Sequence, residues 1–390
     1  MICLIGAGIF LGRLLPAGPF AHGAGLAQQL LTFDGTFYHA IALHGYEWNP
    51  AIGGTFGHGQ NLAFFPAYPV IEAVLRRLSG SQSPVLMLVA GVFFAIWSNL
   101  VFWRLAQALL PAPAAAWAGL FFAIWPANFF ALMDYPVGLI NLCAASCLWH
   151  YLAGRRGKAL LWSGLGTAAA PGAVFIASAI CADLLWKWLH GTKNIRTACR
   201  LFADACLSIW GLLAFMLYQA VKFGNPFAFV AAQRGFTESP SLLQHVFRFL
   251  NPAWYLFPLR FTATMLKSVF HPGALAAAQR HEMIGIAWQL DQDFFIIIFT
   301  IFLLRRGFRT LPPVIWLAAV FILVSYLWFI ATGTFNLLCG MRMLYPALAI
   351  FLMLGVSAGG SRKLGVATLA WLSLSSIAAA ALVVAGYGFI

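Results

Sequence analysis

The stretch VLMLVAGVFFAIWSNLVFW, residues 85–103, decides the fold class of this chain. It runs for 19 positions without a charged residue. A helix rises about 1.5 Å per residue, so a helix of this length matches the ~30 Å hydrocarbon core of a bilayer. The stretch therefore predicts a transmembrane helix.

The composition of the whole chain agrees with a lipid environment. Of its 390 residues, 62% are hydrophobic and 8% are charged, and the mean hydropathy is +0.86. So few charged side chains cannot cover a water-facing surface of this size. The net charge of +13 comes from short basic clusters between apolar runs, which are typical of membrane topology signals and not of nucleic-acid binding.

Other apolar runs also have lengths that suit membrane spans. They cover Met1–Ala17, Ala115–Met133, Val137–Leu152, Leu201–Val221, Ile284–Leu304, Val314–Ala331, Met343–Val356 and Leu364–Val384. Ala159–Leu189 is too long for one helix and too short for two spans, and Pro171 and Gly172 interrupt it, which predicts a re-entrant pair of half-helices. We expect an all-α, polytopic transmembrane helix bundle of about 9–11 spans. It forms a single integral membrane domain over residues 1–390.

The basic clusters predict which end of this bundle faces the cytoplasm, because Lys and Arg near the span ends are retained there. With the hairpin opening inward, four clusters share one face: Arg155/Arg156/Lys158, Lys187/Lys193/Arg196/Arg200, Arg305/Arg306/Arg309 and Arg362/Lys363. The opposite face then carries two long loops, residues 19–84 and 222–282, and eight of the ten acidic residues lie on or near it. We expect the chemistry on this outer face. The shortness of the other loops and the absence of glycosylation sequons from the outer loops favour a bacterial plasma membrane over the endoplasmic reticulum.

Asp34 is the acidic residue with the most distinctive surroundings. It begins a predicted amphipathic, interfacial helix over residues 33–44, and Phe33, Phe37 and Tyr38 flank it. A carboxylate at the boundary of water and lipid can remove a proton from an acceptor hydroxyl. An acidic residue in a first turn can also act simply as a helix cap. The pattern alone leaves both interpretations open.

A resemblance to a known family favours the first interpretation. The run Phe33-Asp-Gly-Thr-Phe-Tyr-His-Ala-Ile-Ala-Leu-His-Gly-Tyr46, followed by Ala63-Phe-Phe-Pro-Ala-Tyr-Pro69, resembles the signature of the mannosyltransferases that add the second mannose to glycosylphosphatidylinositol, and of their bacterial relatives. Two later elements are similar more weakly: Gly224-Asn-Pro-Phe-Ala-Phe-Val-Ala-Ala-Gln233 and Met341-Arg-Met…Tyr345-Pro346. The family belongs to the GT-C class of membrane glycosyltransferases.

The resemblance implies that Asp34 is the catalytic base and that the donor is a polyprenyl-phosphate-sugar. It also makes Arg342 the preferred phosphate ligand, although an arginine that reaches for lipid headgroups is an equally weighted interpretation. The chain departs from the family at Asn225, where the family has Asp, and at Asp134-Tyr-Pro-Val137, where the family often has an acidic residue in another position. We therefore expect no acidic function at position 225, and Asp134 is either a shifted substitute for the family's acidic residue or a residue that satisfies a helix terminus.

The expected chemistry needs one base, because a phosphate leaves without a general acid. It also needs positive charge near that phosphate, and the candidates are Arg342, Arg234, Arg260 and Lys267. For the sugar or the acceptor we expect Tyr38, His58, Gln233, Asp291 and Asp293. We expect no cofactor and no metal, because His39 and His44 are five residues apart and cannot face one ion from a regular helix.

The sequence therefore favours an inverting mannosyltransferase whose partners are a polyprenyl-phosphate-mannose donor, a lipid, glycan or protein acceptor, and membrane lipid. A transporter or flippase of a lipid-linked saccharide is the main alternative, since a Pro-Gly break and intramembrane carboxylates suit one. It predicts paired repeats, which the sequence lacks. A non-catalytic partner subunit with the same fold is the third interpretation.

Overall fold

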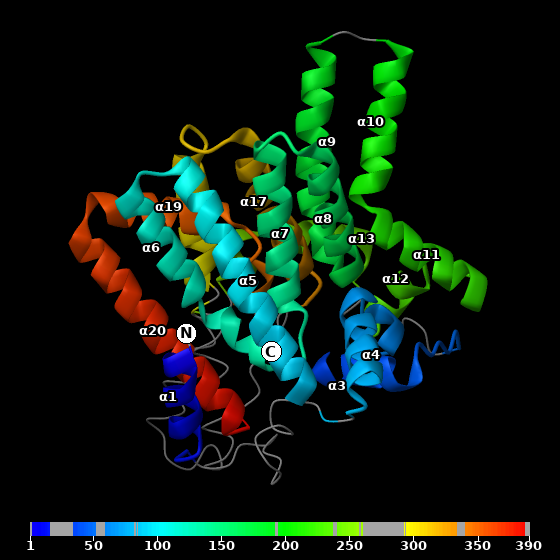
Figure 1. Ribbon diagram of the computed structural model, residues 1–390, viewed down its shortest axis with the longest axis horizontal. Coiled ribbons are helices and arrows are strands. Elements are labelled where there is room, and N and C mark those ends of the chain that lie inside the picture. The colour runs from blue at the N-terminus through cyan, green and yellow to red at the C-terminus, as the bar shows by residue number, and fades with distance from the viewer. Residues whose placement is uncertain are drawn as a thin grey trace.

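The computed structural model describes residues 2–15, 34–51, 59–81, 83, 85–191, 194–236, 240–256, 259, 292, 294–333 and 340–386. Throughout this part the chain forms helices and no strand. Four helical stretches are long and apolar enough to cross a membrane: Val85–Leu109 (α5), Pro171–Leu189, Pro313–Ile330 (α17) and Arg362–Val384 (α20). The protein is an all-α, polytopic membrane bundle, as the apolar runs predict (Figure 1).

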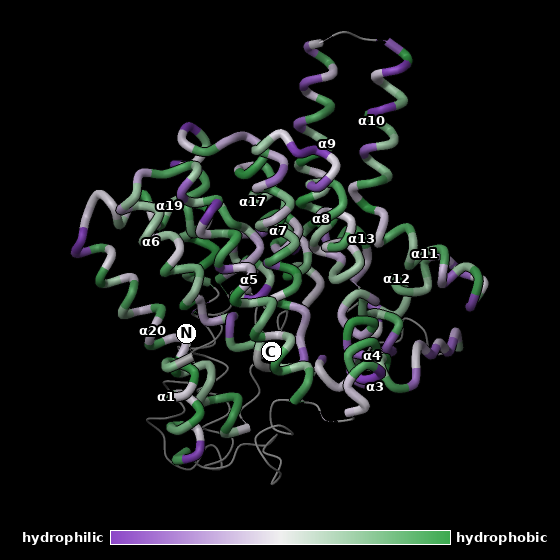
Figure 2. The backbone as a smooth tube through the Cα atoms, viewed as in Figure 1, coloured by the Kyte–Doolittle hydropathy of each residue, from purple (hydrophilic) through white to green (hydrophobic). Residues whose placement is uncertain are grey.

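Shorter helices complete the bundle. They are α1 (Ile2–Gly12), α3 (Asp34–His44), α4 (Ala67–Ser79), α6 (Ala112–Ala123), α7 (Val137–Leu152), α8 (Arg156–Ala169), α9 (Val174–Leu189), α10 (Ile195–Ser208), α11 (Trp210–Phe223), α12 (Ala228–Gln233), α13 (Leu242–Leu250), α14 (Pro252–Tyr255), α18 (Gly340–Met343) and α19 (Ala349–Gly360), with short 3-10 turns η1 (Asn61–Ala63), η2 (Pro126–Leu132) and η3 (Pro171–Ala173). Residues 294–307 are helical as well. Hydrophobic residues predominate along the bundle helices in Figure 2.

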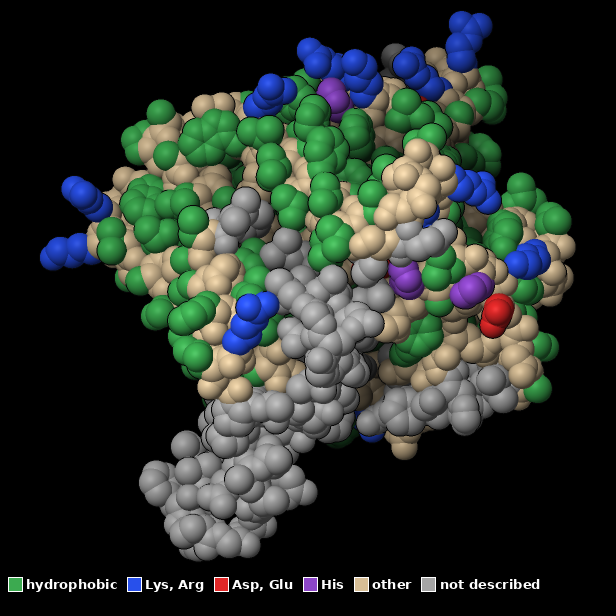
Figure 3. Space-filling view, turned by 60° about the horizontal axis from the view of Figure 1, so that its bottom comes forward, with side chains coloured by type: hydrophobic (Ala, Val, Ile, Leu, Met, Phe, Trp, Pro, Cys, Tyr) green, Lys and Arg blue, Asp and Glu red, His purple; other side chains and the backbone are tan. Residues whose placement is uncertain are grey.

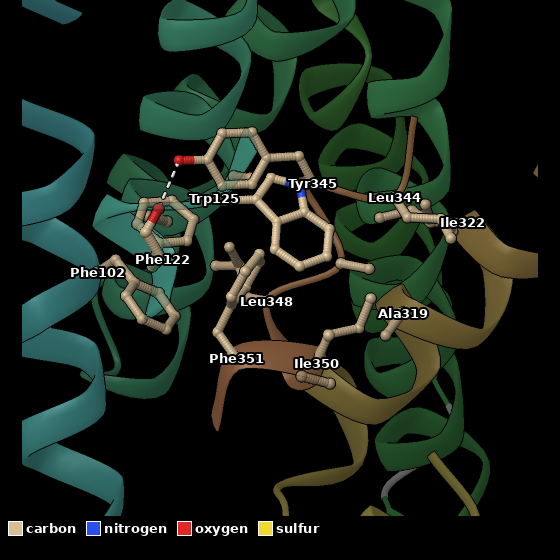
Figure 4. Packing of buried hydrophobic residues seen from close by; sticks show 14 of the residues in the cluster. Phe102, Phe122, Trp125, Ala319, Ile322, Leu344, Tyr345, Leu348, Ile350 and Phe351 are labelled. Atoms are coloured by element: carbon tan, nitrogen blue, oxygen red, sulfur yellow. Dashed lines mark hydrogen bonds between the residues drawn. The ribbon is translucent and has the colours of Figure 1, made fainter. Parts of the chain in front are cut away.

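Close helix packing holds the bundle together, as expected where lipid gives no hydrophobic drive between helices. The helix pairs α5–α7, α6–α19, α7–α8 and α1–α20 have the largest interfaces. Small residues permit this: a Cβ at Gly8 of α1 would lie 2.5 Å from the Cβ of Ala380 on α20. In the central core, Phe102, Phe122 and Phe351 pack against each other (Figure 4).

Two predicted spans are broken helices, which corrects the sequence interpretation. The run Ala115–Met133 ends its α-helix at Ala123, because Pro126 lacks the N–H that would continue the ladder. The side-chain amide of Asn128 donates to the carbonyls of Phe122 and Ala123, both at 2.9 Å, and so satisfies the helix end. The run Met343–Val356 is likewise divided between α18 and α19, with Pro346 in the gap.

The predicted span Leu201–Val221 is also wrong as a single straight helix. It is part of a pair, α10 and α11, that bends by 69° at Ile209. The bend brings α11 against α8, where the Trp210 indole donates to the Leu161 carbonyl (3.2 Å) and the Leu212 N–H donates to the Thr167 hydroxyl (3.2 Å). If the bent pair counts as one span, five candidate spans lie in the described chain.

The predicted hairpin over residues 159–189 does break at Pro171, between α8 and α9. With its leading turn, however, the second arm is a 19-residue stretch, Pro171–Leu189, which is long enough to cross a membrane alone. Whether this pair re-enters the bilayer remains a prediction. The two acidic residues near the basic clusters are paired: Asp183 binds Lys187 at 2.7 Å, and Asp204 binds Arg156.

The molecule has two distinct ends. The α7–α8 turn and the outer ends of α9 and α10 lie at the top of Figure 1, and α3 and α4 lie near the bottom. Figure 3 shows several Lys and Arg side chains along the upper edge. The first-loop helices are therefore at the end remote from the α7–α8 and α9–α10 basic clusters.

Candidate active site

An ion pair joins the two residues that the sequence analysis ranked first. The Nη1 atom of Arg342 lies 3.0 Å from Oδ2 of Asp34, although the residues are 308 positions apart. Asp34 is the first residue of α3, and Arg342 lies in the short helix α18. The side chains are 31% and 18% exposed, respectively. The pair is therefore partly open to its surroundings and is not sealed in the core.

Hydrogen bonds to the buried core hold the residues before and after Arg342 in place. The Trp125 indole donates to the carbonyl of Met341 at 2.9 Å, and the Tyr345 hydroxyl donates to the carbonyl of Phe122 at 2.9 Å (Figure 4). Trp125 and Tyr345 are almost fully buried. These bonds fix the backbone on either side of Arg342, which leaves its side chain to reach Asp34.

Two aromatic rings line the guanidinium of Arg342. Its Cζ atom lies 5.4 Å from the ring centre of Phe130 and 5.1 Å from that of Tyr135. Guanidinium groups are attracted to aromatic faces at such distances. The rings thus keep the positive charge close to Asp34 without neutralising it.

Asp34 is fixed through its backbone and its neighbour. The Asp34 N–H donates to the hydroxyl of Tyr135 at 3.1 Å, and a Cβ at Gly35 would lie 3.3 Å from the Cβ of Asp134. A side chain at position 35 would require Asp134 to shift by a few tenths of an ångström, so glycine favours this close approach of α3. The Asp34 carboxylate reaches an arginine from the other end of the chain, a partner that a purely capping residue would not require.

The expectation of an amphipathic α3 needs correction. Its apolar and polar residues are not separated onto opposite faces. Instead, Gly35, Tyr38 and Ile41 are buried at spacings of three residues. Contacts with α4 and the 61–65 segment, and not lipid-directed amphipathicity, position the helix. Among the described helices, α4 and α13 are strongly amphipathic, and α13 buries none of its residues.

The Tyr38 side chain of α3 packs against aromatic rings of the first loop. Its ring centre is 5.2 Å from that of Phe64 and 5.6 Å from that of Tyr68, both in edge-to-face geometry. Burial, and next the negative charge of Asp34, raise the pKa of the Tyr38 hydroxyl far above its usual value, so it stays protonated. The two blocks of the first-loop resemblance are thus packed together, and a sugar contact for Tyr38 remains a prediction.

A second charged cluster, which sequence reasoning missed, lies where α3, α4 and Asp134 meet. The Nδ1 atom of His39 lies 2.8 Å from Oε1 of Glu72 and 3.9 Å from Oδ2 of Asp134. The Nε of Arg76 donates to the same Glu72 oxygen at 2.8 Å. Burial, and next the charge of Glu72, raise the pKa of the Asp134 carboxyl to about 8.

The remaining predicted site residues have varied positions. Gln233 donates its Nε2 to the carbonyl of Ala63 at 2.8 Å, so it ties α12 to the first loop. Arg234 is exposed at the end of α12. The Asn225 side chain accepts from the Phe227 N–H at 2.9 Å, a turn bond that an uncharged residue can make. Five predicted residues lie outside the described residues: His58, Arg260, Lys267, Asp291 and Asp293.

Comparisons with known proteins give a distant likeness. No protein-family model matches the sequence, and no curated protein matches it. Structures of the oligosaccharyltransferase of Archaeoglobus fulgidus are similar to the chain: the complex with Zn and sulfate (14% identity, TM-score 0.48), AglB with an inhibitory peptide and a dolichol-phosphate (12%, 0.46), and the apo form (13%, 0.45). They cover 98%, 98% and 99% of this chain, which spans 52%, 55% and 55% of theirs.

Proposed function

We propose that this protein is an inverting glycosyltransferase that moves mannose from a polyprenyl-phosphate-mannose donor to a hydroxyl acceptor. The observation that carries the proposal is the 3.0 Å contact between Arg342 and Asp34. This contact joins a carboxylate and a guanidinium that lie near opposite ends of the chain. The family resemblance assigns both groups to one reaction. Both belong to the elements that resemble the mannosyltransferases.

The two side chains suffice for a single displacement. The Asp34 carboxylate takes the proton of the acceptor hydroxyl while that oxygen forms a bond to the anomeric carbon. The bond from the anomeric carbon to the phosphate oxygen breaks, and its electron pair stays on the phosphate. The Arg342 guanidinium stabilises the added negative charge. The configuration at the anomeric carbon inverts, because the acceptor enters opposite the leaving phosphate.

The ion pair also suits the arrival of a charged donor. A guanidinium has five N–H donors in a fixed plane, and one of its nitrogens, Nη1, contacts Asp34. A phosphate that approaches Arg342 competes for this cation and weakens its hold on Asp34. The carboxylate is then available to accept the proton of the acceptor hydroxyl.

The location of the pair supports a non-cytoplasmic site. Asp34 belongs to α3, which lies at the end of the bundle remote from the α7–α8 and α9–α10 basic clusters (Figure 1). Basic clusters mark the cytoplasmic side of membrane proteins. The reaction would then take place at the outer surface of a plasma membrane or, in the alternative, on the lumenal side of the endoplasmic reticulum.

Transfer can be tested with the purified full-length chain in detergent. The chain is incubated with polyprenyl-phosphate-[¹⁴C]mannose and, separately, with lipid, glycan and peptide acceptors. We expect label in an acceptor and an equal amount of free polyprenyl phosphate, with an inverted anomeric configuration. In liposomes, movement of an unaltered labelled donor across the bilayer without any product would instead support the flippase, and neither activity would support the partner subunit.

A further inference from the structure

The cluster of His39, Glu72 and Asp134 has a geometry that the proposed transfer reaction does not use. These side chains come from α3, α4 and the segment before α7. Their Nδ1 and carboxylate oxygen atoms all lie within 4.8 Å of one another. In a tetrahedral site with bond lengths of about 2.1 Å, the ligand atoms are about 3.4 Å apart. Side-chain shifts of up to about 1 Å would therefore bring all three atoms to one ion.

Several oxygen atoms of this cluster have no hydrogen-bond partner among the described residues. They are both carboxylate oxygens of Asp134 and Oε2 of Glu72. Asp134 is 2% exposed and Glu72 is 0% exposed, so bulk water does not satisfy them. Buried carboxylate oxygens normally have partners, and unpartnered ones indicate a bound ion or water. The Tyr68 hydroxyl, one helical turn before Glu72, is buried and interacts with Asp134.

The contacts of His39 give a second indication. Its Nδ1 atom lies 2.8 Å from Oε1 of Glu72 and 3.0 Å from Nη2 of Arg76. One ring nitrogen either donates a proton or offers a lone pair, so it cannot satisfy an acceptor and a donor together. If Nδ1 carries the lone pair, that lone pair faces a carboxylate oxygen. A cation bound by this lone pair and by a carboxylate oxygen of Glu72 would turn the repulsion into two bonds.

We propose that His39, Glu72 and Asp134 form a binding site for a divalent first-row transition metal. One imidazole nitrogen and two carboxylates suit Zn²⁺ or Mn²⁺ better than Mg²⁺, which prefers oxygen ligands and retained water. Because two ligands are buried, the site is structural and fixes α3 against α4 and the Asp134 segment. The inference does not depend on the proposed sugar transfer.

Arg76 is the competitor of the metal. Its Nε atom bonds to Oε1 of Glu72 and its Nη2 contacts Nδ1 of His39. A metal ion must displace Nη2 from the lone pair of His39, while Nε can keep Oε1 and leave Oε2 of Glu72 for the ion. Replacement of Arg76 by Gln removes one positive charge next to the site, so it should tighten metal binding.

The test measures metal binding and needs no catalytic assay. The purified full-length chain in detergent is dialysed against Zn²⁺ or Mn²⁺, and bound metal per chain is measured by mass spectrometry. We expect about one ion per chain, with affinity reduced at least about 100-fold in His39→Ala and Asp134→Asn. In Arg76→Gln the affinity should rise by about tenfold, since like charges no longer repel. Gel filtration identifies variants that fail to fold.

Matched controls separate this site from adventitious binding. His44 is exposed on the same helix as His39, and Glu47 is exposed in the loop that follows it. We expect His44→Ala and Glu47→Gln to bind metal like the unaltered chain. A metal content that is the same in folded His39→Ala, folded Asp134→Asn and the unaltered chain overturns the proposal, as does the absence of bound metal in the unaltered chain.

Discussion

Two carboxylate–arginine pairs lie near α3 and differ in sequence separation and in exposure. Asp34 and Arg342 come from opposite ends of the chain, meet at 3.0 Å and are 31% and 18% exposed. Glu72 and Arg76 are one helical turn apart on α4, meet at 2.8 Å and are 0% and 4% exposed. The same two functional groups thus occur once in an accessible place and once in a sealed one.

The difference indicates which pair can take part in chemistry. An accessible pair can open when a charged ligand competes for the arginine, at little cost in desolvation. A sealed pair cannot open without leaving a charge in an apolar interior, which is strongly unfavourable. We therefore assign reaction to Asp34 and Arg342, and we assign structural support to Glu72 and Arg76.

The variant Asp34→Asn is the strongest test of this assignment. Removal of a general base lowers a rate by up to about 10⁴-fold, and the isosteric amide keeps the size of the side chain. We expect mannose transfer to fall by that order while the yield and thermal stability of the purified chain stay unchanged. Glu47→Gln, at an exposed position of the same loop, is the control and should retain full activity. Transfer at the original rate in Asp34→Asn would remove Asp34 as the base.

The sealed pair should show a large effect on stability. In the metal-free chain, Arg76→Met leaves the buried Glu72 carboxylate without its arginine, and such losses cost about 3–5 kcal/mol. Lys187→Met breaks a pair with the same one-turn spacing, but Lys187 is 63% exposed, so a loss below about 1 kcal/mol is expected. Thermal unfolding of the detergent-purified variants measures the contrast. Equal effects in the two variants would mean that burial does not distinguish the pairs.

The variant Arg342→Gln tests the role of the accessible arginine. Loss of one charged donor to a developing anion lowers a rate by about 10²-fold, so we expect a decrease of this order in kcat/KM for the lipid-linked donor. Arg342→Lys should recover part of it, because the point charge remains without the planar fork. Arg77, exposed on α4, gives the control variant Arg77→Gln. A full rate in Arg342→Gln would leave Arg342 as a headgroup ligand only.

Most of the fold was predictable because the hydropathy of a segment indicates whether lipid or water surrounds it. The run at residues 85–103 is part of α5, and the C-terminal run is part of α20. The breaks at Pro126 and Pro346 were missed because a count of apolar residues ignores the missing N–H of a proline. The bend at Ile209 has no such local signal. It results from hydrogen bonds between α11 and α8, which only the packed structure contains.

The site was predictable in part. Family resemblance selected Asp34 and Arg342 separately, but no sequence pattern shows that side chains 308 positions apart touch. The spacing of Glu72 and Arg76 did carry a signal, since residues four apart face each other on a helix. It is also the spacing of ordinary surface pairs, and burial decides between the two. His39 was compared with His44, its neighbour in sequence, whereas its partners in space lie on other segments.

Tyr135→Phe should give the smallest effect and tests how Asp34 is held. The Tyr135 hydroxyl accepts the Asp34 N–H at 3.1 Å, and the Tyr135 ring also lies 5.1 Å from the Arg342 guanidinium. Phe keeps the ring and removes only the acceptor, a loss of about 0.5–1.5 kcal/mol for one hydrogen bond. We expect transfer to fall by less than about tenfold, with no change in donor KM, since Arg342 keeps its aromatic contact. A decrease as large as that of Asp34→Asn would show that the hydroxyl itself takes part in proton transfer, and the division between the accessible and the sealed pair would then have to include Tyr135.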